Sequence, residues 1–369
     1  MYSASGQKMK IVHVSPTYFA DASVVGGGER YAQELARAMA GLAPTTFISL
    51  GAKRMSRRDG SLQIEILPAR DRAGRRAPPV SADFLRLVTR ADVVHCHQLG
   101  TPVNVLAMVV ARLRGTRCFV TPLGASPTRA EHRIMRLVGF TGFLCISAFS
   151  ARTIPYLLPS CVIGGGVDAE RFRATGQKER KIVSVARLLP HKGLNYLIEA
   201  VESDMPLEIY GRPYDRRHLD DLLRLAAGKP VRIVTDASDE DIATAYSSAL
   251  VTVLPSVYRD MYGTSWAEPE LLGLTLLESM ACGTAVIGTR VGAIPEHVRE
   301  GETGYLVPPN DPAALRQALH RLLDNPALAV RLGARGREVA CRDFSWVTVA
   351  RRCLDAYDTV RAKRRLVLG

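Results

Sequence analysis

Short apolar runs recur along the chain and alternate with longer segments in which apolar residues keep helical spacing. Residues 10–15 (KIVHVS) and 92–96 (DVVHC) are typical of buried strands, whereas residues 29–42 place apolar or small side chains three and four positions apart. The alternation restarts after a polar stretch at residues 168–180. Because strands that alternate with helices form parallel sheets, we expect an α/β protein with two doubly wound parallel-sheet domains.

Residues 270–298 form the segment around which the second domain is organised. The apolar run at 274–282 predicts a short helix, and Glu270 and Glu278 stand on either side of residues 273–275 (GLT). The N-terminus of a helix attracts anions through its free N–H groups and its dipole. We therefore interpret the segment as a nucleotide-sugar site, with a phosphate at the helix and a carboxylate on each side to bind hydroxyl groups. Without further context, two glutamates beside a helix are more commonly surface caps.

Two cations follow the first strand of the second domain. Arg187 and Lys192 stand five positions apart after the apolar run at 182–186, and Gly193 opens a helix. This arrangement suits a cationic clamp on a diphosphate. The alternative is a solvated arginine at a strand end and a lysine at a helix start. The sequence has no DxD-like acidic pair between apolar strands, and we expect no metal ion at the site.

The first domain begins with a strand, a glycine-rich turn and a helix. Gly26, Gly27 and Gly28 separate the strand at 10–15 from the helix at 29–42. Glycines at such a turn let the backbone approach a phosphate or a sugar closely. The alternative is a flexible surface turn.

Length and cysteine content narrow the class of protein. The 369 residues suggest two domains of ordinary size, and no apolar run reaches the roughly 20 residues that span a bilayer. The first ten residues are polar and do not resemble a signal peptide. The seven cysteines are scattered and include no CxxC pair. We expect buried thiols in a reducing cytoplasm, with neither a zinc site nor a disulfide framework.

The positive charge is concentrated in the first half of the chain. Up to Thr175 there are 23 Lys and Arg residues against 11 Asp and Glu, whereas beyond it there are 26 against 25. The basic clusters lie in predicted loops, at 53–58, 70–76 and 129–136. They fit either solvated surface loops or contact with an anionic acceptor or an acidic membrane surface. Because they lack interleaved aromatic residues, we expect no nucleic-acid binding.

Six segments together resemble a known family. They are GGGER at 26–30, DVVHCH at 92–97, CISAFS at 145–150, GGGVDAERF at 164–172, VARLLPHKG at 185–193, and the segment at 270–298. Their order and spacing resemble the GT-B glycosyltransferases of the large retaining family four, also called glycosyl transferases group 1. The resemblance implies two Rossmann-like domains that face each other across a cleft.

The resemblance also implies how the chain is divided. Residues 1–170 would form an N-terminal acceptor-binding domain, and residues 171–345 a C-terminal domain that binds the nucleotide sugar. Residues 346–369 would form a helix that packs back on the N-terminal domain.

The family assigns roles to the candidate residues. Arg187 and Lys192 would stabilise the charge of the leaving diphosphate, Glu278 would bind the ribose hydroxyls, and Glu270 would bind sugar hydroxyls near the reacting centre. The remaining donor contacts would come from backbone groups at Gly273, Leu274, Thr275, Leu276, Gly27 and Gly28. Residues 258–269 would form a lid or a donor-side contact, or else a packed surface loop.

A histidine near the donor sugar is also implied by the resemblance. We expect His95 and His97 to point to opposite faces if the strand continues through both. We favour His97, beyond the strand end and facing the cleft, as the residue that orients the donor or stabilises positive charge. The alternative for either residue is a hydrogen-bonded histidine at a strand end.

The implied activity is the transfer of a sugar, with retention, from a UDP- or GDP-sugar to a hydroxyl acceptor. The nucleotide sugar would be a co-substrate, and no cofactor or metal is expected. The acceptor would be a small molecule or a lipid-linked group, in cell-surface polysaccharide, glycolipid or natural-product glycoside synthesis. We expect a cytoplasmic protein, with peripheral membrane contact through the basic N-terminal domain as one alternative. The alternative functions are a GT-B nucleotide-sugar epimerase and an inactive glycosyltransferase-like partner subunit.

Overall fold

The chain folds into two compact units. The computed structural model describes residues 8–19, 27–69, 71–72, 75–76, 81–124, 133–135, 137–154 and 158–367. Unit 1 comprises Met1–Gly166 and Trp346–Gly369, and unit 2 comprises Val167–Ser345. The sequence placed the first boundary after residue 170, so the chain leaves unit 1 slightly earlier than expected. Gly26, the basic cluster at 129–136 except for residues 133–135, and part of the cluster at 70–76 lie outside the described residues.

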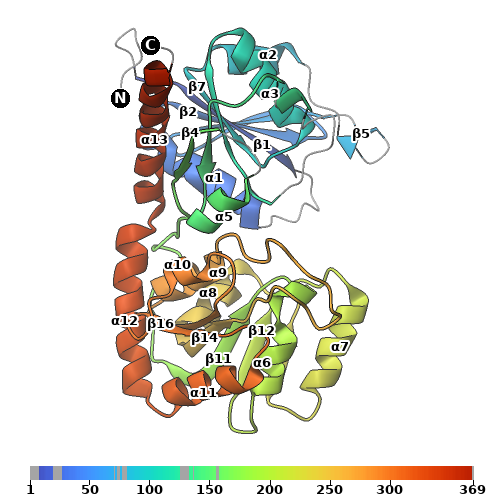
Figure 1. Ribbon diagram of the computed structural model, residues 1–369, viewed down its shortest axis with the longest axis vertical. Helices are drawn as coiled ribbons and strands as arrows, with labels where there is room; N and C mark the ends of the chain where they lie inside the picture. The colour runs from blue at the N-terminus through green and yellow to red at the C-terminus, as the bar shows by residue number, and fades with distance from the viewer. Residues whose placement is uncertain are drawn as a thin grey trace. The chain divides into compact units, whose positions relative to one another are not determined.

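Unit 1 is built on a twisted sheet whose described strands run in the order β10-β9-β8-β7-β1-β2-β4-β3 (Figure 1). Its strands are β1 (Ile11–Phe19), β2 (Thr45–Gly51), β3 (Met55–Asp59), β4 (Leu62–Pro68), β7 (Val93–His97), β8 (Arg117–Thr121), β9 (Gly142–Cys145) and β10 (Ser160–Val162). A separate two-stranded sheet pairs β5 (Asp71–Arg72) with β6 (Arg75–Arg76). Its helices are α1 (Gly27–Ala40), α2 (Ala82–Thr89), α3 (Pro102–Leu113), α5 (Ala148–Thr153) and α13 (Trp346–Val367).

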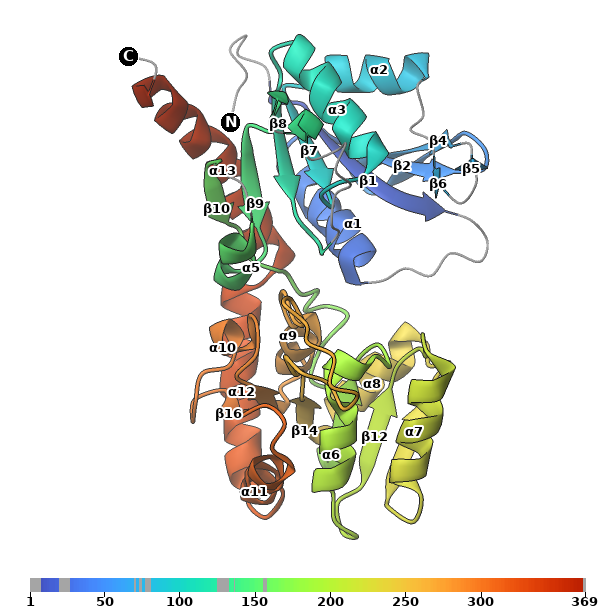
Figure 2. The same ribbon diagram turned by 45° about the vertical axis from the view of Figure 1, so that its right-hand side comes forward.

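Helices cover both faces of the unit 1 sheet. On one face, α1 buries Ala32 and Ala36 against Phe47 and Ile64 of the strands, and α13 packs against α1 and β9. In Figure 2 the C-terminal helix α13 lies alongside β9 at one edge of the sheet. On the other face, α2 and α3 contribute a larger apolar cluster that includes Phe84. Buried strands with helices on both faces are the arrangement that the alternation predicted.

Two of the predicted basic loops contain strands, and the cluster at 70–76 includes β5 and β6. The basic segment at 53–58 was expected to be a loop, but Met55–Asp59 pairs antiparallel with β4 at the edge of the sheet. Arg57 and Arg58 are exposed on this strand. Charged side chains on an edge strand discourage pairing with another chain, which is why the strand has the composition of a surface loop.

Unit 2 contains a parallel sheet with the strand order β13-β12-β11-β14-β15-β16. Its strands are β11 (Glu179–Val185), β12 (Leu207–Tyr210), β13 (Val231–Val234), β14 (Ala249–Leu254), β15 (Ala285–Thr289) and β16 (Gly304–Val307). Its helices are α6 (Leu194–Ala200), α7 (Arg216–Ala226), α8 (Asp239–Ser248), α9 (Leu274–Ala281), α10 (Ile294–His297), α11 (Pro312–Leu323) and α12 (Pro326–Asp343), with a 3₁₀ turn at Pro190–Lys192.

The core of unit 2 also lies on both faces of its sheet. Leu197 of α6, Leu222 of α7 and Leu319 of α11 pack in one apolar cluster, while Leu277 of α9 and Tyr246 of α8 pack in another. The strand order reverses between β11 and β14, and ligands of such sheets bind beyond the carboxyl ends of the strands at this point. Lys192 follows β11, and the segment that leads to Glu270 follows β14. The fold therefore brings the two predicted motifs of unit 2 to the same end of the sheet.

Among the helices that the structure describes, none combines the length and the apolar character needed to span a bilayer.

Candidate active site

The two predicted motifs of unit 2 meet in a buried ion pair. Lys192 ends the 3₁₀ turn after β11, and Glu270 lies just ahead of α9. The Lys192 Nζ atom is 2.7 Å from Glu270 Oε2, and their side chains are only 10% and 12% exposed. Lys192 also donates to the Pro269 carbonyl at 3.2 Å. The sequence placed both residues at one site but did not predict that they bind each other.

The Glu270 carboxylate is held by three groups. Its Oε1 atom accepts the Gly273 N–H at 3.0 Å, and Oε2 accepts the Ser256 hydroxyl at 3.2 Å in addition to Lys192. Burial by itself would raise the pKa of Glu270, but the Lys192 ammonium and these hydrogen bonds keep the pKa below its usual value. The carboxylate is therefore ionised at neutral pH and fixed in orientation. Ser256, which follows β14, was not singled out from the sequence because an isolated serine carries no signal.

Two glycines allow the backbone to approach closely at this point. A Cβ atom at Gly193, next to Lys192, would lie 2.0 Å from the Pro255 carbonyl oxygen. A Cβ atom at Gly292 would lie 2.0 Å from the Glu270 carbonyl oxygen. Because both obstacles are backbone atoms, no side chain could move aside to make room. Gly193 thus lets the turn that carries Lys192 lie against the end of β14, and Gly292 lets the loop after β15 lie against Glu270.

The N-terminus of α9 has the features of an anion site. Its N-cap is Gly273, which makes no side-chain cap hydrogen bond. The Leu276 N–H is already bonded to the Gly273 carbonyl at 3.0 Å. Of the four backbone groups predicted to bind the donor, the Gly273 and Leu276 N–H groups are thus engaged within the protein. The N–H groups of Leu274 and Thr275 are those best placed in the first turn to receive an anion.

Glu278 lies on the second turn of α9 and is 6% exposed. The Tyr246 hydroxyl of α8 donates to its Oε2 atom at 3.4 Å. Burial, and then the nearby Glu278 charge, raise the pKa of Tyr246 well above its usual value, so the phenol remains a donor. The second predicted carboxylate is therefore a partly engaged acceptor on the same helix as the anion site.

Arg187 is exposed, unlike Lys192, and its guanidinium carbon lies 5.9 Å from the centre of the Tyr214 ring. Both cations act on His191, which lies between them in the sequence. Burial, and then the charges of Lys192 and Arg187, lower the pKa of His191 to about 4. The two predicted cations therefore lie close enough to share an electrostatic neighbour, and that neighbour is neutral at physiological pH.

The loop at 258–269 was predicted to be a lid, a donor-side contact or a packed surface loop. In the structure it is packed. The buried Asp260 carboxylate accepts the Trp266 indole N–H at 2.8 Å and the backbone N–H groups of Tyr262 and Thr264 at 2.9 and 3.0 Å. The Trp266 ring lies 4.4 Å from the His191 ring, centre to centre. The loop thus packs against the turn that carries Lys192. Asp260 could have been anticipated from the sequence, since an aspartate ahead of turn residues commonly caps their N–H groups.

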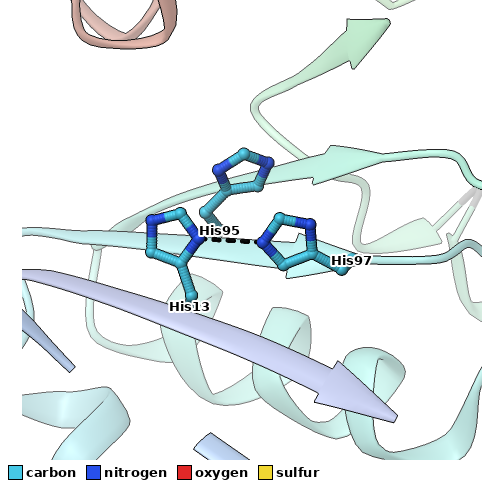
Figure 3. Close-up of side chains that lie close together, drawn as sticks. All are labelled: His13, His95 and His97. Carbon is cyan, nitrogen blue, oxygen red and sulfur yellow. Dashed lines mark hydrogen bonds between the residues drawn. The ribbon is translucent and has the colours of Figure 1, made fainter. Parts of the chain in front are cut away.

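Unit 1 carries three buried histidines side by side (Figure 3). His13 of β1 and His95 and His97 of β7 are all fully buried. The His13 Nδ1 and His97 Nε2 atoms are 2.8 Å apart. His95 bonds the Tyr357 hydroxyl at 2.8 Å through Nδ1 and the Thr121 hydroxyl at 2.7 Å through Nε2.

Two expectations about these histidines are wrong. His95 and His97 do not point to opposite faces, since their rings stack with centres 4.5 Å apart. Residues two positions apart in a strand share a face, so a strand that continues through both must place them together. His97 is also the last residue of β7 rather than a residue beyond it, and it is fully buried. His13 was missed because only the register of β1 against β7, which aligns His13 with His95, reveals it.

The three histidines have the composition of a metal site but not its geometry. One nitrogen from each lies within 4.8 Å of the others, and burial lowers the pKa of all three, that of His13 to about 3, so the rings are neutral. Metal ligation requires ring nitrogens that converge in the planes of their rings. Here the His95 ring stacks on His97, and both of its nitrogens are engaged by Tyr357 and Thr121. The cluster is better described as a hydrogen-bonded stack.

Gly27 and Gly28 lie in the first turn of α1, slightly earlier than the predicted helix start. A Cβ atom at Gly27 would meet nothing within 4 Å, and one at Gly28 would make an ordinary contact with Leu123. Among the residues that the structure describes, none requires glycine at either position.

Comparisons with known proteins cover most of the chain. Residues 168–339 match the family described as glycosyl transferases group 1, and residues 26–149 match the glycosyl transferase 4-like domain. The first region contains Arg187, Lys192, Glu270 and Glu278, and the second contains Gly27, Gly28 and His97.

Curated relatives are sugar transferases and synthases. The chain is 33% identical over 211 residues to the MMP alpha-(1->4)-mannosyltransferase of Mycolicibacterium hassiacum, covering 55% of this chain and 49% of that protein. It is 31% identical over 243 residues to an alpha-maltose-1-phosphate synthase of Mycobacterium tuberculosis, covering 57% of this chain and 60% of that protein. The chain thus matches about half the length of these relatives.

A solved structure shows the same fold. The Anabaena protein HepE in complex with UDP superposes with a TM-score of 0.72 at 14% identity, covering 95% of this chain and 100% of that chain. HepE has also been solved with UDP-glucose. The fold is the GT-B fold of two parallel-sheet α/β domains that the sequence predicted.

Proposed function

Because this chain belongs to the group 1 glycosyltransferases, we propose that it transfers a sugar from a nucleotide-diphosphate donor to a hydroxyl group, with retention and without a metal ion. The observation that carries the proposal is the buried Lys192–Glu270 pair ahead of the uncapped N-terminus of α9. It supplies a cation, a fixed carboxylate and free backbone donors within a few residues of one another. These are the groups that a diphosphate and a sugar require.

Cations would stabilise the leaving group. Breaking the bond between the sugar and the diphosphate leaves negative charge on the phosphate oxygens, and donors fixed beforehand stabilise that charge. A lysine ammonium has three N–H donors, and the bonds to Glu270 and Pro269 account for two. The third is available for a phosphate oxygen. Arg187, which is exposed, would supply a second cation, and the α9 N-terminus would bind the other phosphate oxygens.

The two carboxylates would bind hydroxyl groups. Glu270 is ionised and fixed by three donors, so the lone pairs it has left suit the hydroxyls of the sugar near the reacting centre. Glu278, on the next turn of α9, would accept from the ribose of the nucleotide. The solved complexes of HepE with UDP and UDP-glucose support a donor of the uridine class. The basic excess of the first half of the chain favours an acceptor that carries negative charge, either a small molecule or a lipid-linked group.

We expect one nucleoside diphosphate to stabilise the protein against heat. A ligand that binds the folded state at a concentration 100 times its Kd adds about 2.7 kcal/mol to the free energy of unfolding. Thermal unfolding should therefore be measured with UDP, GDP and ADP in turn, and the response to one of them identifies the donor class. Nucleotide release from the matching donor sugar should then be unchanged by EDTA. A protein that responds to none of the three nucleotides would contradict the proposed activity, and restoration by Mg²⁺ after EDTA would contradict the metal-independent reaction.

Replacing Glu278 with glutamine should weaken nucleotide binding by about 10- to 100-fold. The change removes a charged acceptor, and a hydrogen bond to a charged group contributes about 1.5–3 kcal/mol. The measurement is the Kd of the responding nucleotide by calorimetry. Glu199→Gln on α6 is the matched control, because Glu199 is exposed on the same unit and lies outside the proposed site. Equal affinities for the two variants would show that Glu278 does not bind the ribose.

A further inference from the structure

The backbone at the end of β7 is held in a fixed conformation around His97. Gln98, the next residue, has φ +75°, a left-handed conformation that non-glycine residues adopt at a cost of roughly 1 kcal/mol or more. The Asn104 side chain of α3 donates to the carbonyls of both His97 and Gln98, at 2.5 and 2.7 Å. Strain of this kind persists only where neighbouring groups enforce it. The fold thus fixes the backbone position from which the His97 side chain extends.

The His97 ring is held separately, through its partner on β1. His13 Nδ1 and His97 Nε2 share one hydrogen bond of 2.8 Å. The rings are nearly parallel, at 18°, and His95 stacks against His97 at 25° (Figure 3). Because Tyr357 and Thr121 hold both nitrogens of His95, that ring is a fixed platform. His97 is therefore restrained in its ring plane by His13 and across its face by His95.

The number of protons on the His13–His97 pair leads to a specific consequence. Two neutral imidazoles carry two N–H groups, and their shared bond uses one N–H and one lone pair. The outer nitrogens, His13 Nε2 and His97 Nδ1, are buried and have no partner among the described residues. One of them must carry the second N–H and the other a lone pair. Whether His97 Nδ1 is a donor or an acceptor therefore depends on the tautomer of His13.

We propose that His13 is a positioning residue for His97, fixing its ring and setting whether its Nδ1 atom donates or accepts a hydrogen bond. This inference rests on the proposed function and on the role that the family resemblance implies for His97, contact with the donor sugar. A sugar hydroxyl both donates and accepts, so the pair can meet it in either neutral tautomer. The two tautomers differ in the position of two protons, the shared one and the one on the outer nitrogen, so the ring that carries the outer N–H changes when the shared bond reverses its direction. A ligand oxygen that accepts from Nδ1 also gives a partner to an N–H that is otherwise buried and unpaired. A single hydrogen bond from His97 Nδ1 would thus both orient the sugar and give the buried N–H its partner.

The test is a double-mutant cycle on turnover, with nucleotide release from the donor found by the thermal screen as the assay. His13→Phe and His97→Phe keep an aromatic ring to stack on His95 but remove the shared hydrogen bond. We expect His13→Phe to lower kcat by about tenfold, the scale of one hydrogen bond. Since His13 acts through His97, the double variant should be no slower than His97→Phe alone. His13→Asn, whose amide can occupy the place of Nδ1, should recover most of the rate.

Spectra of the ring nitrogens provide a second measurement that needs no turnover. In protein labelled with ¹⁵N-histidine, the His97 nitrogens should change their protonation pattern in His13→Phe and keep it in His13→Asn. Thr45→Val, a buried polar change on β2 outside the cluster, is the control for general disturbance of unit 1.

The outcomes separate the two proposals. If His97→Phe lowers turnover but the effects of the two single changes add, the positioning role is wrong while the proposed function stands. If the His97→Phe variant has the same turnover rate as the unchanged protein, His97 does not contact the sugar, and the inference is then wrong as well. The nucleotide response, which depends on unit 2, would be unaffected in that case. Non-additive rates together with altered His97 nitrogens support the inference.

Discussion

Replacing Lys192 with methionine should lower turnover by about 10²- to 10³-fold and also destabilise the protein by about 3 kcal/mol. The loss of rate follows from removing a cation that stabilises the leaving diphosphate. The loss of stability has a different origin. Lys192 is the charged partner of Glu270, and both side chains are almost fully buried. Removing one partner of a buried pair leaves the other charge without compensation.

The double variant Lys192→Met/Glu270→Gln separates these two effects. It removes both charges, so most of the lost stability should return, because a buried neutral pair has no uncompensated charge. Turnover should remain as low as in Lys192→Met or fall further. Denaturant unfolding and nucleotide release are the two measurements. Recovery of turnover in the double variant would mean that the pair is only structural and would contradict its proposed role in the reaction.

Replacing Arg187 with alanine should lower turnover by about 10²-fold and leave the free energy of unfolding within about 0.5 kcal/mol of its original value. Arg187 is exposed, and surface substitutions outside caps and ion pairs have small effects on stability. Its proposed contribution arises only when charge develops on the leaving diphosphate. Nucleotide release and thermal unfolding of the same preparations measure both effects.

Two further variants control the Arg187 experiment. Arg216→Ala, at the start of α7, removes a side chain that is 91% exposed, outside the site and paired, among the described residues, only with the exposed Asp220 at 3.8 Å. Because such surface pairs contribute about 0.3–0.5 kcal/mol, the change should leave turnover unaltered and stability nearly so. Arg187→Lys keeps the charge but not the planar donor pair of a guanidinium. A rate close to that of the original protein would assign the effect to charge, whereas a rate close to that of Arg187→Ala would assign it to two-point binding. An Arg187→Ala protein that turns over normally would remove Arg187 from the mechanism.

The fold could be predicted because buried parallel strands leave a strong pattern. Runs such as residues 182–186, bounded by polar turns and followed by helical spacing, indicate strand and helix without knowledge of what they contact. The edge strand Met55–Asp59 could not be predicted in this way. An exposed, charged strand is defined by the hydrogen bonds of its backbone to β4, and side-chain patterns do not report them.

The composition of the candidate site could be predicted, but its contacts could not. Lys192 and Glu270 were placed in one site through motif resemblance, yet 78 positions separate them and no local pattern encodes their ion pair. The same is true of His13, which lies opposite His95 only because β1 and β7 pair in one particular register. The error about His95 and His97 had another cause. The two-residue period of a strand, applied correctly, would have placed both rings on one face.

The C-terminal helix has a consequence for how the protein is made. Unit 1 takes α13 from the far end of the chain, and Tyr357 of that helix supplies the hydroxyl that holds His95. Unit 2 is continuous, so all of it has been synthesised before Trp346 is added. A ribosome adds roughly 5–20 residues per second. For the whole synthesis of unit 2, the nascent unit 1 therefore lacks the helix that packs on α1 and β9, and its histidine stack stays incomplete until α13 has emerged.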